Sequence, residues 1–325
     1  MFKKIRLGYP GGFHDPECGD VVSELRCNRT VILTRKGGRG QHPPENIATR
    51  AAELAAQNIA DLLGILKYNE SRGIKFFRIS SEICPHISNW RIIDGDVLDY
   101  KRLAYSLDLF AGGLAAVSKF AKKHGHRLTF HPGPFTILNT DKKFVLASVK
   151  RELWWHAQFL EALGLPESSL TLHIGGVYGN RKTSAARFIK NFRELPEVIR
   201  KYIIIENDEN NYCAEDLLDI SAATGIPVCF DYFHYLCWNV FHRKDPQKYR
   251  KQAPADKLIP RILATWGTRR PKFHLSEQYP GKVLGTHSMF IKKIPKILRG
   301  LDIDLMLESK CKELTLLALT SNNYE

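Results

Sequence analysis

The feature that most constrains the fold is a series of short apolar runs that recur along the whole chain. Each run is rich in β-branched and aromatic residues and is bounded by polar or turn-forming residues, which is the composition of buried β-strands. The predicted strands cover residues 5–9, 75–80, 127–131, 170–175, 202–207, 227–231, 272–275 and 303–308.

The segments between these runs have apolar residues three and four positions apart, as amphipathic helices do. The clearest lie at residues 48–69, 107–123, 144–163, 185–199 and 215–224. Eight strands that alternate with helices predict an α/β fold, a single (β/α)₈ TIM barrel, whereas a doubly wound sheet of this length usually has fewer strands. We expect one domain over residues 1–325, with a long first loop at 10–44 and a short C-terminal tail from about 311 to 325.

The charge balance favours a polyanionic partner. Lysine and arginine total 48 against 34 aspartates and glutamates, a formal net charge of +14, and such an excess binds phosphates with release of counterions. Nucleic acid is therefore the first candidate partner, and a surface that is charged only for solubility is the alternative.

The seven cysteines are an odd number without a C-x-x-C pair, so the sequence suggests neither a disulfide framework nor a zinc ribbon. No apolar stretch reaches the length of a membrane span, and none follows the basic N-terminal residues as it would in a signal peptide. We expect a cytoplasmic protein that acts at the nucleoid, with no membrane association and no obligate protein partner.

Two segments depart from the simple alternation of strand and helix. The first loop carries a set of basic residues, namely Arg26, Arg29, Arg35, Lys36 and Arg39, and either clamps a phosphate backbone or is an ordinary solvated loop. The second, at residues 238–250, adds aromatic and basic residues after the sixth strand.

Residues that can bind metal ions recur where the predicted strands end. In chain order they are His131, His173, Glu206, Asp231, His234, His274, His287 and Glu308. The C-terminal ends of TIM-barrel strands meet at the active-site face, so these side chains should converge, although any one of the histidines alone is more often a core residue. The joint pattern predicts a metal centre.

The predicted ligands are too numerous for one tetrahedral ion, and carboxylates readily bridge two metals. We expect two or three divalent ions. Nitrogen and oxygen ligands without thiolate favour manganese, with zinc as the alternative.

Lys272 precedes His274 by two residues, so in a strand both side chains point to the same face. An ammonium group beside several cations would be repelled. A depressed pKa, a carboxylate partner and carbamylation of Lys272 are the three explanations that the sequence leaves open.

Several longer motifs carry a resemblance to a known family. They are R-L-G-Y-P (6–10), H-P-G (131–133), L-H-I-G-G-V-Y-G (172–179), E-N-D-E (206–209), D-Y-F-H (231–234), P-K-F-H-L-S (271–276) and L-E-S-K (307–310). In this order the chain resembles the UV damage endonucleases, which are related to endonuclease IV and to the xylose isomerase-like barrels.

The resemblance implies three metal ions in the barrel mouth. His131, His173 and Glu206 would hold the first, while Glu206 would bridge to a second held by Asp231, His274 and Glu308. His234 and His287 would hold the third. The implied reaction is hydrolysis of the phosphodiester 5′ to a UV photoproduct in damaged double-stranded DNA, leaving a 3′-hydroxyl and a 5′-phosphate, with Glu206, Lys272 and Glu308 as the expected catalytic residues.

The resemblance also implies DNA-probing residues, and here the chain departs from the family. Tyr9 matches a tyrosine beside the DNA strand, and Tyr178 in the L-H-I-G-G-V-Y-G motif is a further candidate contact. After H-P-G the family has glutamine and an aromatic residue, where this chain has Pro134 and Phe135. Proline has no side-chain hydrogen bond to offer, whereas phenylalanine can still act as an apolar wedge, so we expect looser lesion selectivity that extends to abasic sites.

A further departure follows the second strand, where Asn89 lies near a family histidine for which His86 is a possible substitute. Three alternative functions remain open. They are an abasic-site endonuclease of the endonuclease IV type, a metal-dependent sugar isomerase or epimerase, and a DNA-binding protein without catalysis, which has no reason to keep so many metal ligands.

Overall fold

The computed structural model describes residues 4–14, 16–19, 23–32, 44–244 and 250–321. Eight strands form one closed barrel in chain order, with every neighbouring pair parallel. They are β1 (Arg6–Pro10), β2 (Phe76–Ile79), β3 (Arg127–Phe130), β4 (Ser169–His173), β5 (Ile203–Glu206), β6 (Val228–Asp231), β7 (Lys272–Leu275) and β8 (Asp304–Leu307). The predicted TIM barrel is confirmed, and each predicted run overlaps one strand.

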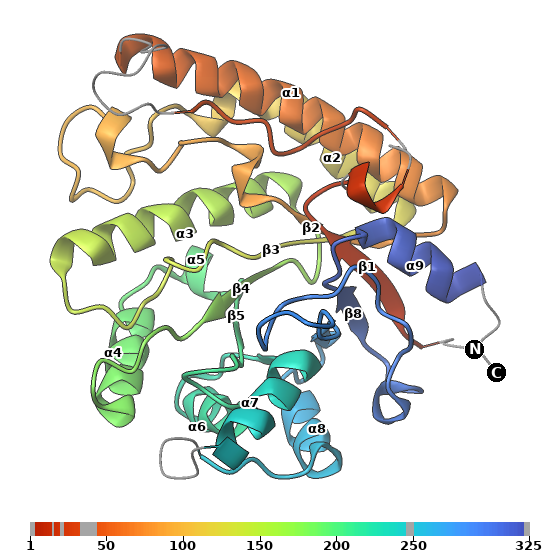
Figure 1. Ribbon diagram of the computed structural model, residues 1–325. Coiled ribbons are helices and arrows are strands. Elements are labelled where there is room, and N and C mark those ends of the chain that lie inside the picture. The colour runs from red at the N-terminus through yellow and green to blue at the C-terminus, as the bar shows by residue number, and fades with distance from the viewer. Residues whose placement is uncertain (1–3, 15, 20–22, 33–43, 245–249, 322–325) are drawn as a thin grey trace.

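Helices surround the barrel (Figure 1). They are α1 (Pro44–Ser71), α2 (Ala111–His124), α3 (Lys143–Leu163), α4 (Arg181–Arg193), α5 (Glu197–Arg200), α6 (Ala214–Thr224), α7 (Tyr232–Lys244), α8 (Ala255–Ala264) and α9 (Lys312–Ser321). The connection from β7 to β8, all of whose residues are described, contains only the short 3₁₀ helix Lys296–Leu298.

Two helical predictions need correction. The helix expected at 185–199 is divided into α4 and α5, because Pro196 lacks a backbone N–H and disfavours helical geometry in the residue before it. Most of the insertion expected at 238–250 instead belongs to α7, which begins directly after β6. Residues 245–249 lie outside the described part of the chain.

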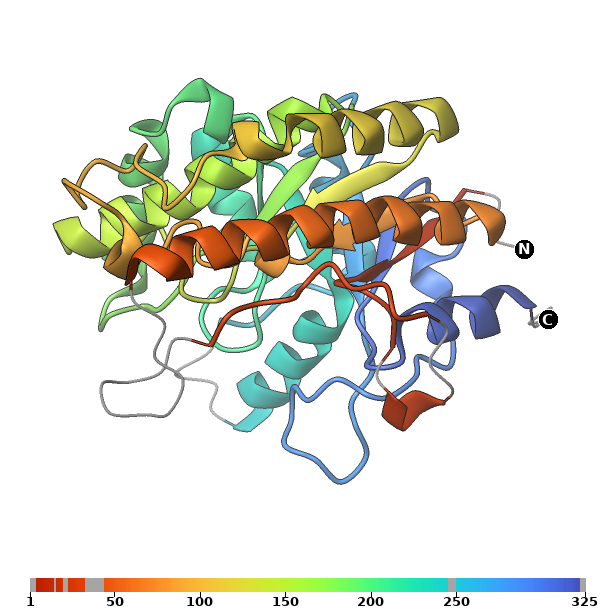
Figure 2. The same ribbon diagram turned by 90° about the horizontal axis from the view of Figure 1, so that it is seen from above.

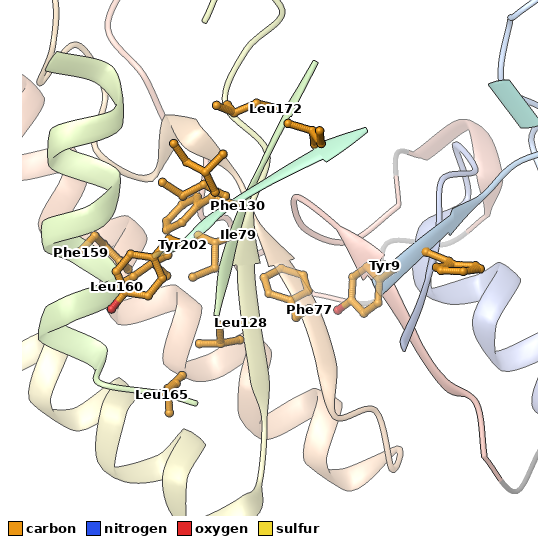
Figure 3. Close-up of a cluster of buried hydrophobic side chains, with 14 of the residues drawn as sticks. Tyr9, Phe77, Ile79, Leu128, Phe130, Phe159, Leu160, Leu165, Leu172 and Tyr202 are labelled. Carbon is orange, nitrogen blue, oxygen red and sulfur yellow. The ribbon is translucent and has the colours of Figure 1, made fainter. Parts of the chain in front are cut away.

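The residues that alternate along each strand separate an outer apolar layer from the barrel interior. In the outer layer Phe130 packs edge-to-face on Phe159 of α3, with ring centroids 5.3 Å apart (Figure 3). Inside the barrel, a Cβ on Gly8 would come within 2.5 Å of the Phe76 ring, so β1 needs glycine at that position. Burial of each such phenylalanine contributes roughly 1.5–3 kcal/mol to folding.

A buried ion-pair network closes the N-terminal end of the barrel. The fully buried carboxylate of Asp304 accepts hydrogen bonds from Arg6 Nε at 2.7 Å, Arg127 Nη1 at 2.8 Å and Arg270 Nε at 2.6 Å. Arg127 is itself buried and lies over the Phe76 and Trp266 rings. Charged side chains that bind one another therefore occupy this end of the barrel.

The first loop lies along α1 where it is described (Figure 2). Arg29 forms an ion pair with Asp61 of α1 at 2.7 Å, and Asn58 of α1 donates to the Arg29 carbonyl at 3.0 Å. Arg29 is therefore tied to a helix, which weakens the phosphate-clamp interpretation of this residue. Arg35, Lys36 and Arg39 lie outside the described residues.

The segment expected as a short C-terminal tail, from about residue 311, is described as far as Ser321. It forms α9, which packs against β1 (Figure 1). Immediately before α9, Cys311 forms a disulfide with Cys18 of the first loop, with the two Cα atoms 5.5 Å apart. The cysteine pattern suggested no disulfide framework, and it gave no sign of this single bond; the other five thiols are free and buried. A pairing across 293 residues leaves no spacing pattern in the sequence.

None of the described helices combines the length and apolar character that crossing a membrane requires.

Candidate metal centre

The C-terminal end of the barrel is lined by a ring of polar side chains. Each comes from the last inward-facing position of a strand or from the residue directly after it, and the members of this ring are Arg78, His131, His173, Glu206, Asp231, His274 and Glu308. Because neighbouring parallel strands end at the same edge, the closed barrel brings together residues that are far apart in the sequence.

One group that could hold a metal ion consists of His131, His173 and Glu206. The Oε2 atom of Glu206 lies 2.9 Å from His131 Nε2 and 3.7 Å from His173 Nε2. The other ring nitrogen of His131 lies 3.2 Å from the backbone carbonyl of Pro132. Donation from Nδ1 to this carbonyl leaves the lone pair of Nε2 directed at the centre, as is usual for histidine ligands.

A second group shares Glu206 and adds Asp231 and His274. Here the Oε1 atom of Glu206 lies 2.6 Å from His274 Nδ1, which is also 3.2 Å from Glu308 Oε1. The two oxygens of Glu206 therefore face different groups. This is the arrangement of a bridging carboxylate, and all three residues of the group are buried.

His234 and His287 lie beside this centre but belong to neither group. Their ring centroids are 6.3 Å apart. In His234, Nδ1 lies 2.9 Å from the Asn207 carbonyl oxygen, and Nε2 lies 3.7 Å from Glu209 Oε2. In His287, Nδ1 lies 3.9 Å from Glu308 Oε2. The expected third pair of ligands is adjacent in space, although among the described residues it forms no compact set of three.

Buried polar atoms without a partner provide a test of whether these residues suit a metal. Asp231 Oδ1 accepts the His234 backbone N–H at 2.7 Å, but Asp231 Oδ2 has no hydrogen-bond partner. His173 Nδ1 and His274 Nε2 are likewise buried and unpaired among the described residues. Leaving such atoms unpaired costs about 1–3 kcal/mol each. The unpaired Oδ2 of Asp231, a carboxylate oxygen of the second group, fits a cation-binding site, whereas the two unpaired imidazole nitrogens are not the ring nitrogens nearest Glu206.

The electrostatics of the site keep Glu206 ionised. Burial raises the pKa of Glu206, but the neighbouring His274, His173 and His131 outweigh burial and hold the pKa well below its usual range. For Asp231, burial dominates and raises the pKa to about 6. Burial lowers the pKa of His234, but the carboxylates of Asp231, Glu206 and Glu209 overcome this effect and raise it to about 10.

Lys272 lies fully buried in the barrel, one inward step below His274 on β7. Its Nζ donates to Thr171 Oγ1 at 2.7 Å, and burial lowers its pKa to about 8. Among the described residues no carboxylate forms an ion pair with it. Of the three explanations that the sequence left open, the structure does not support a carboxylate partner for Lys272. It supports a depressed pKa.

Arg78 is the member of the ring that the sequence interpretation missed. It forms an ion pair through Nη1 with Glu308 Oε1, and the side chains of Arg78 and His131 are exposed to the same degree, 17% and 16%. The signal was present in the sequence, because Arg78 alternates with the outward-facing Phe77 and Ile79 in an otherwise apolar strand.

The loops after β3 and β4 present the candidate DNA contacts. Phe135 is 88% exposed, beside the exposed Pro134, and Tyr178 is 60% exposed. Asn139 Nδ2 donates to the Gly176 carbonyl at 2.6 Å and so joins the two loops. Gly175 is required at this junction because its φ is +103° and a Cβ there would come within 2.7 Å of Asn139 Oδ1.

The structure also places Tyr9 and Asn89, the two remaining predicted DNA contacts. Tyr9 is fully buried on the outer face of β1, where its hydroxyl donates to Asn69 of α1 at 2.7 Å and its ring packs on Phe77 (Figure 3). Strand alternation directs it to the helices, so the expectation that it lies beside DNA is not supported. Asn89 caps the 3₁₀ helix Trp90–Ile92, and His86 is occupied by the Val31 carbonyl at 2.6 Å.

The comparisons with known proteins agree on one family. A model of the family "UV-endonuclease UvdE" matches residues 14–325. The chain is 38% identical to a putative UV-damage endonuclease of Acanthamoeba polyphaga mimivirus over 97% of this chain and 90% of that protein. It is 29% identical to the UV DNA damage endonuclease of Clostridium perfringens over 96% of this chain and 69% of that protein.

A solved structure agrees as well. The crystal structure of SacUVDE superposes with a TM-score of 0.76 and 28% sequence identity, and the match covers 98% of this chain and 97% of that one. This agreement confirms the resemblance drawn from the sequence motifs. The chain is a member of the UvdE family of UV endonucleases.

Proposed function

We propose that the protein is a metal-dependent endonuclease that incises damaged double-stranded DNA on the 5′ side of a UV photoproduct, leaving a 3′-hydroxyl and a 5′-phosphate. The observation that carries this proposal is the pair of ligand groups that share Glu206 at the open end of a UvdE-family barrel. Relatives in this family are named UV DNA damage endonucleases.

The residues present suit two or three divalent ions. His131, His173 and Glu206 would hold one ion, Glu206, Asp231, His274 and Glu308 a second, and His234 with His287 a third. Such ions supply a nucleophile at neutral pH and offset negative charge on the phosphate. The mixture of imidazole and carboxylate without thiolate favours manganese, with zinc as the alternative.

The chain's own side chains keep this arrangement in place. Glu206 contributes one oxygen to each group, and Asp231 is oriented because its other oxygen caps the first turn of α7. Burial lowers the pKa of Lys272 to about 8, and carbamylation of its Nζ would convert a cation below the ligands into an anion.

The substrate-contacting surface lies on the loops after β3 and β4. Phe135 is an exposed apolar side chain that can enter between base steps, while Pro134 offers no hydrogen bond to a lesion. We therefore propose a looser preference among lesions, including incision at abasic sites. The net charge of +14 supplies attraction to the phosphate backbone.

The test is incision of end-labelled duplexes that carry a cyclobutane dimer, a 6-4 photoproduct, an abasic site or no damage. Each is incubated with manganese, with zinc, or with chelator. Chelator-sensitive incision immediately 5′ to a photoproduct is the expected result. Failure to incise any damaged duplex with either metal would contradict the proposal, and equal incision of undamaged DNA would contradict damage recognition.

A further inference from the structure

Arg78 is a charged member of the polar ring whose function the ligand groups do not explain. A guanidinium is always protonated and cannot coordinate a metal, and a permanent cation beside metal ions lowers their affinity. Its position therefore needs a reason that outweighs this repulsion.

The hydrogen bonds of Arg78 leave most of its donors unused. Nη1 pairs with Glu308 Oε1. Its Nε and Nη2 atoms have no hydrogen-bond partner among the described residues, and neither is one of the buried nitrogens that lack a partner. Both are therefore open to solvent at the mouth of the barrel.

Arg127 provides a contrast inside the same barrel. Its side chain is 1% exposed, and its guanidinium is used by Asp304, by backbone carbonyls and by two aromatic rings. Arg127 is thus a structural arginine, whereas Arg78 has an accessible charge and free donors on the side from which substrate would arrive.

We propose that Arg78 is a catalytic residue that binds a non-bridging oxygen of the DNA phosphate at the incision site, while its Nη1 stays paired with Glu308. This inference rests on the proposed function. A phosphodiester carries a negative charge that grows during in-line attack, and a guanidinium fork matches phosphate oxygens in geometry and charge. The ion pair with Glu308 fixes the side chain in advance, so little rotational entropy is lost when DNA binds.

The experiment compares R78Q, R78K and the wild type, with R50Q as the matched control because Arg50 is an exposed arginine on α1. Single-turnover incision is measured at saturating manganese. Manganese affinity of the metal-free protein is measured by calorimetry, and the shift in Tm caused by inorganic phosphate is measured on the manganese-loaded protein.

We expect R78Q to slow incision about 100-fold or more, the scale of losing one donor to a developing oxyanion. R78K should recover only part of the rate, because lysine keeps the charge but not the fork. Manganese affinity should be unchanged or tighter in R78Q, and the phosphate-induced Tm shift should shrink. R50Q should match the wild type in every measurement.

Two results would overturn the assignment. If R78Q incised DNA at the wild-type rate, Arg78 would not be needed to bind the phosphate during incision. A tenfold weaker manganese affinity in R78Q, with the rate restored by excess metal, would show that Arg78 acts only through Glu308. If the wild type incised no DNA, the proposed function would fail. The shift in Tm caused by inorganic phosphate would still decide whether Arg78 binds phosphate.

Discussion

Glu206 is the residue on which the candidate centre depends most directly. Its two carboxylate oxygens face opposite groups, with Oε2 toward His131 and His173 and Oε1 toward His274. An amide in this position has one acceptor oxygen and one donor nitrogen, so it cannot serve both groups.

The change Glu206→Gln should therefore lower metal content by at least one ion per chain and slow incision more than about 100-fold, since loss of a residue behind a metal ligand already costs about 10- to 100-fold. Elemental analysis and single-turnover incision measure the two effects. Glu53→Gln, at an exposed position on α1, is the matched control. Full metal content in the Glu206 variant would refute the bridging role.

Phe135 gives a second prediction for a single residue. Its side chain is 88% exposed, so Phe135→Ala should change the free energy of unfolding by less than about 0.5 kcal/mol. If the ring enters the helix at a lesion, the variant should bind and incise damaged duplexes about tenfold less well, on the scale of one lost stacking contact.

The companion change Pro134→Gln should narrow the preference among lesions, because it restores a side chain that can hydrogen bond. Incision of the abasic duplex relative to the photoproduct duplex measures this effect. An unchanged ratio in Pro134→Gln and unchanged binding in Phe135→Ala would exclude this loop from recognition.

At the scale of elements, the strands are joined at the closed end of the barrel by one carboxylate. Asp304 of β8 binds Arg6 of β1, Arg127 of β3 and Arg270, which precedes β7. Burial raises the pKa of Asp304, but the hydrogen bond from Arg6 and the charge of Arg127 outweigh it and hold the pKa below its usual range. The barrel thus depends on this side chain being ionised.

A carboxyl group with a lowered pKa stabilises the folded state above its ordinary pKa, and this stabilisation is lost as the pH falls toward the lowered value. The free energy of unfolding of the wild type, measured with urea, should therefore fall as the pH is lowered below about 4. Asp304→Asn should cost about 3–5 kcal/mol at neutral pH, because it leaves the buried guanidinium of Arg127 without its carboxylate partner, and it should flatten the dependence of stability on acidic pH.

Asp302→Asn is the matched control for this prediction. Asp302 pairs with the same Arg270, but its side chain is 68% exposed, so its removal should cost at most about 1 kcal/mol. An equal decrease in the free energy of unfolding in the two variants would contradict the importance of burial at Asp304.

At the scale of the whole molecule, the Cys18–Cys311 disulfide ties the first loop to the end of β8 across 293 residues. Closing so long a loop restricts the unfolded chain, and the stabilisation expected is about 3–5 kcal/mol. Reduction, or Cys18→Ser, should therefore lower Tm by about 5 °C or more.

Thermal unfolding with and without reductant checks this prediction, and Cys18→Ser should be insensitive to reductant. Thiol titration in denaturant should count five thiols before reduction and seven after it. Seven thiols before reduction would show that the bond does not form in the isolated protein.

The sequence predicted much of the site because strand ends in a barrel converge. Once eight strands are recognised, His131, Glu206 and Asp231 must face the same mouth, whatever their separation in the chain. It did not predict which polar inward residues lack a ligand role, and so Arg78 was overlooked. Tyr9 was expected beside DNA from the family resemblance, whereas strand alternation directs its side chain to the helix layer, where its hydroxyl binds Asn69.

The sequence by itself determined the alternation of strand and helix, the chemical types gathered at the strand ends and the membership of a family, since all three are carried by local order and residue identity. The tertiary structure decided which oxygen of Glu206 faces which histidine, that Arg78 pairs with Glu308, and that Cys18 meets Cys311. These contacts depend on barrel closure, strand register and rotamer choice, which set distances between residues that have no relation in sequence.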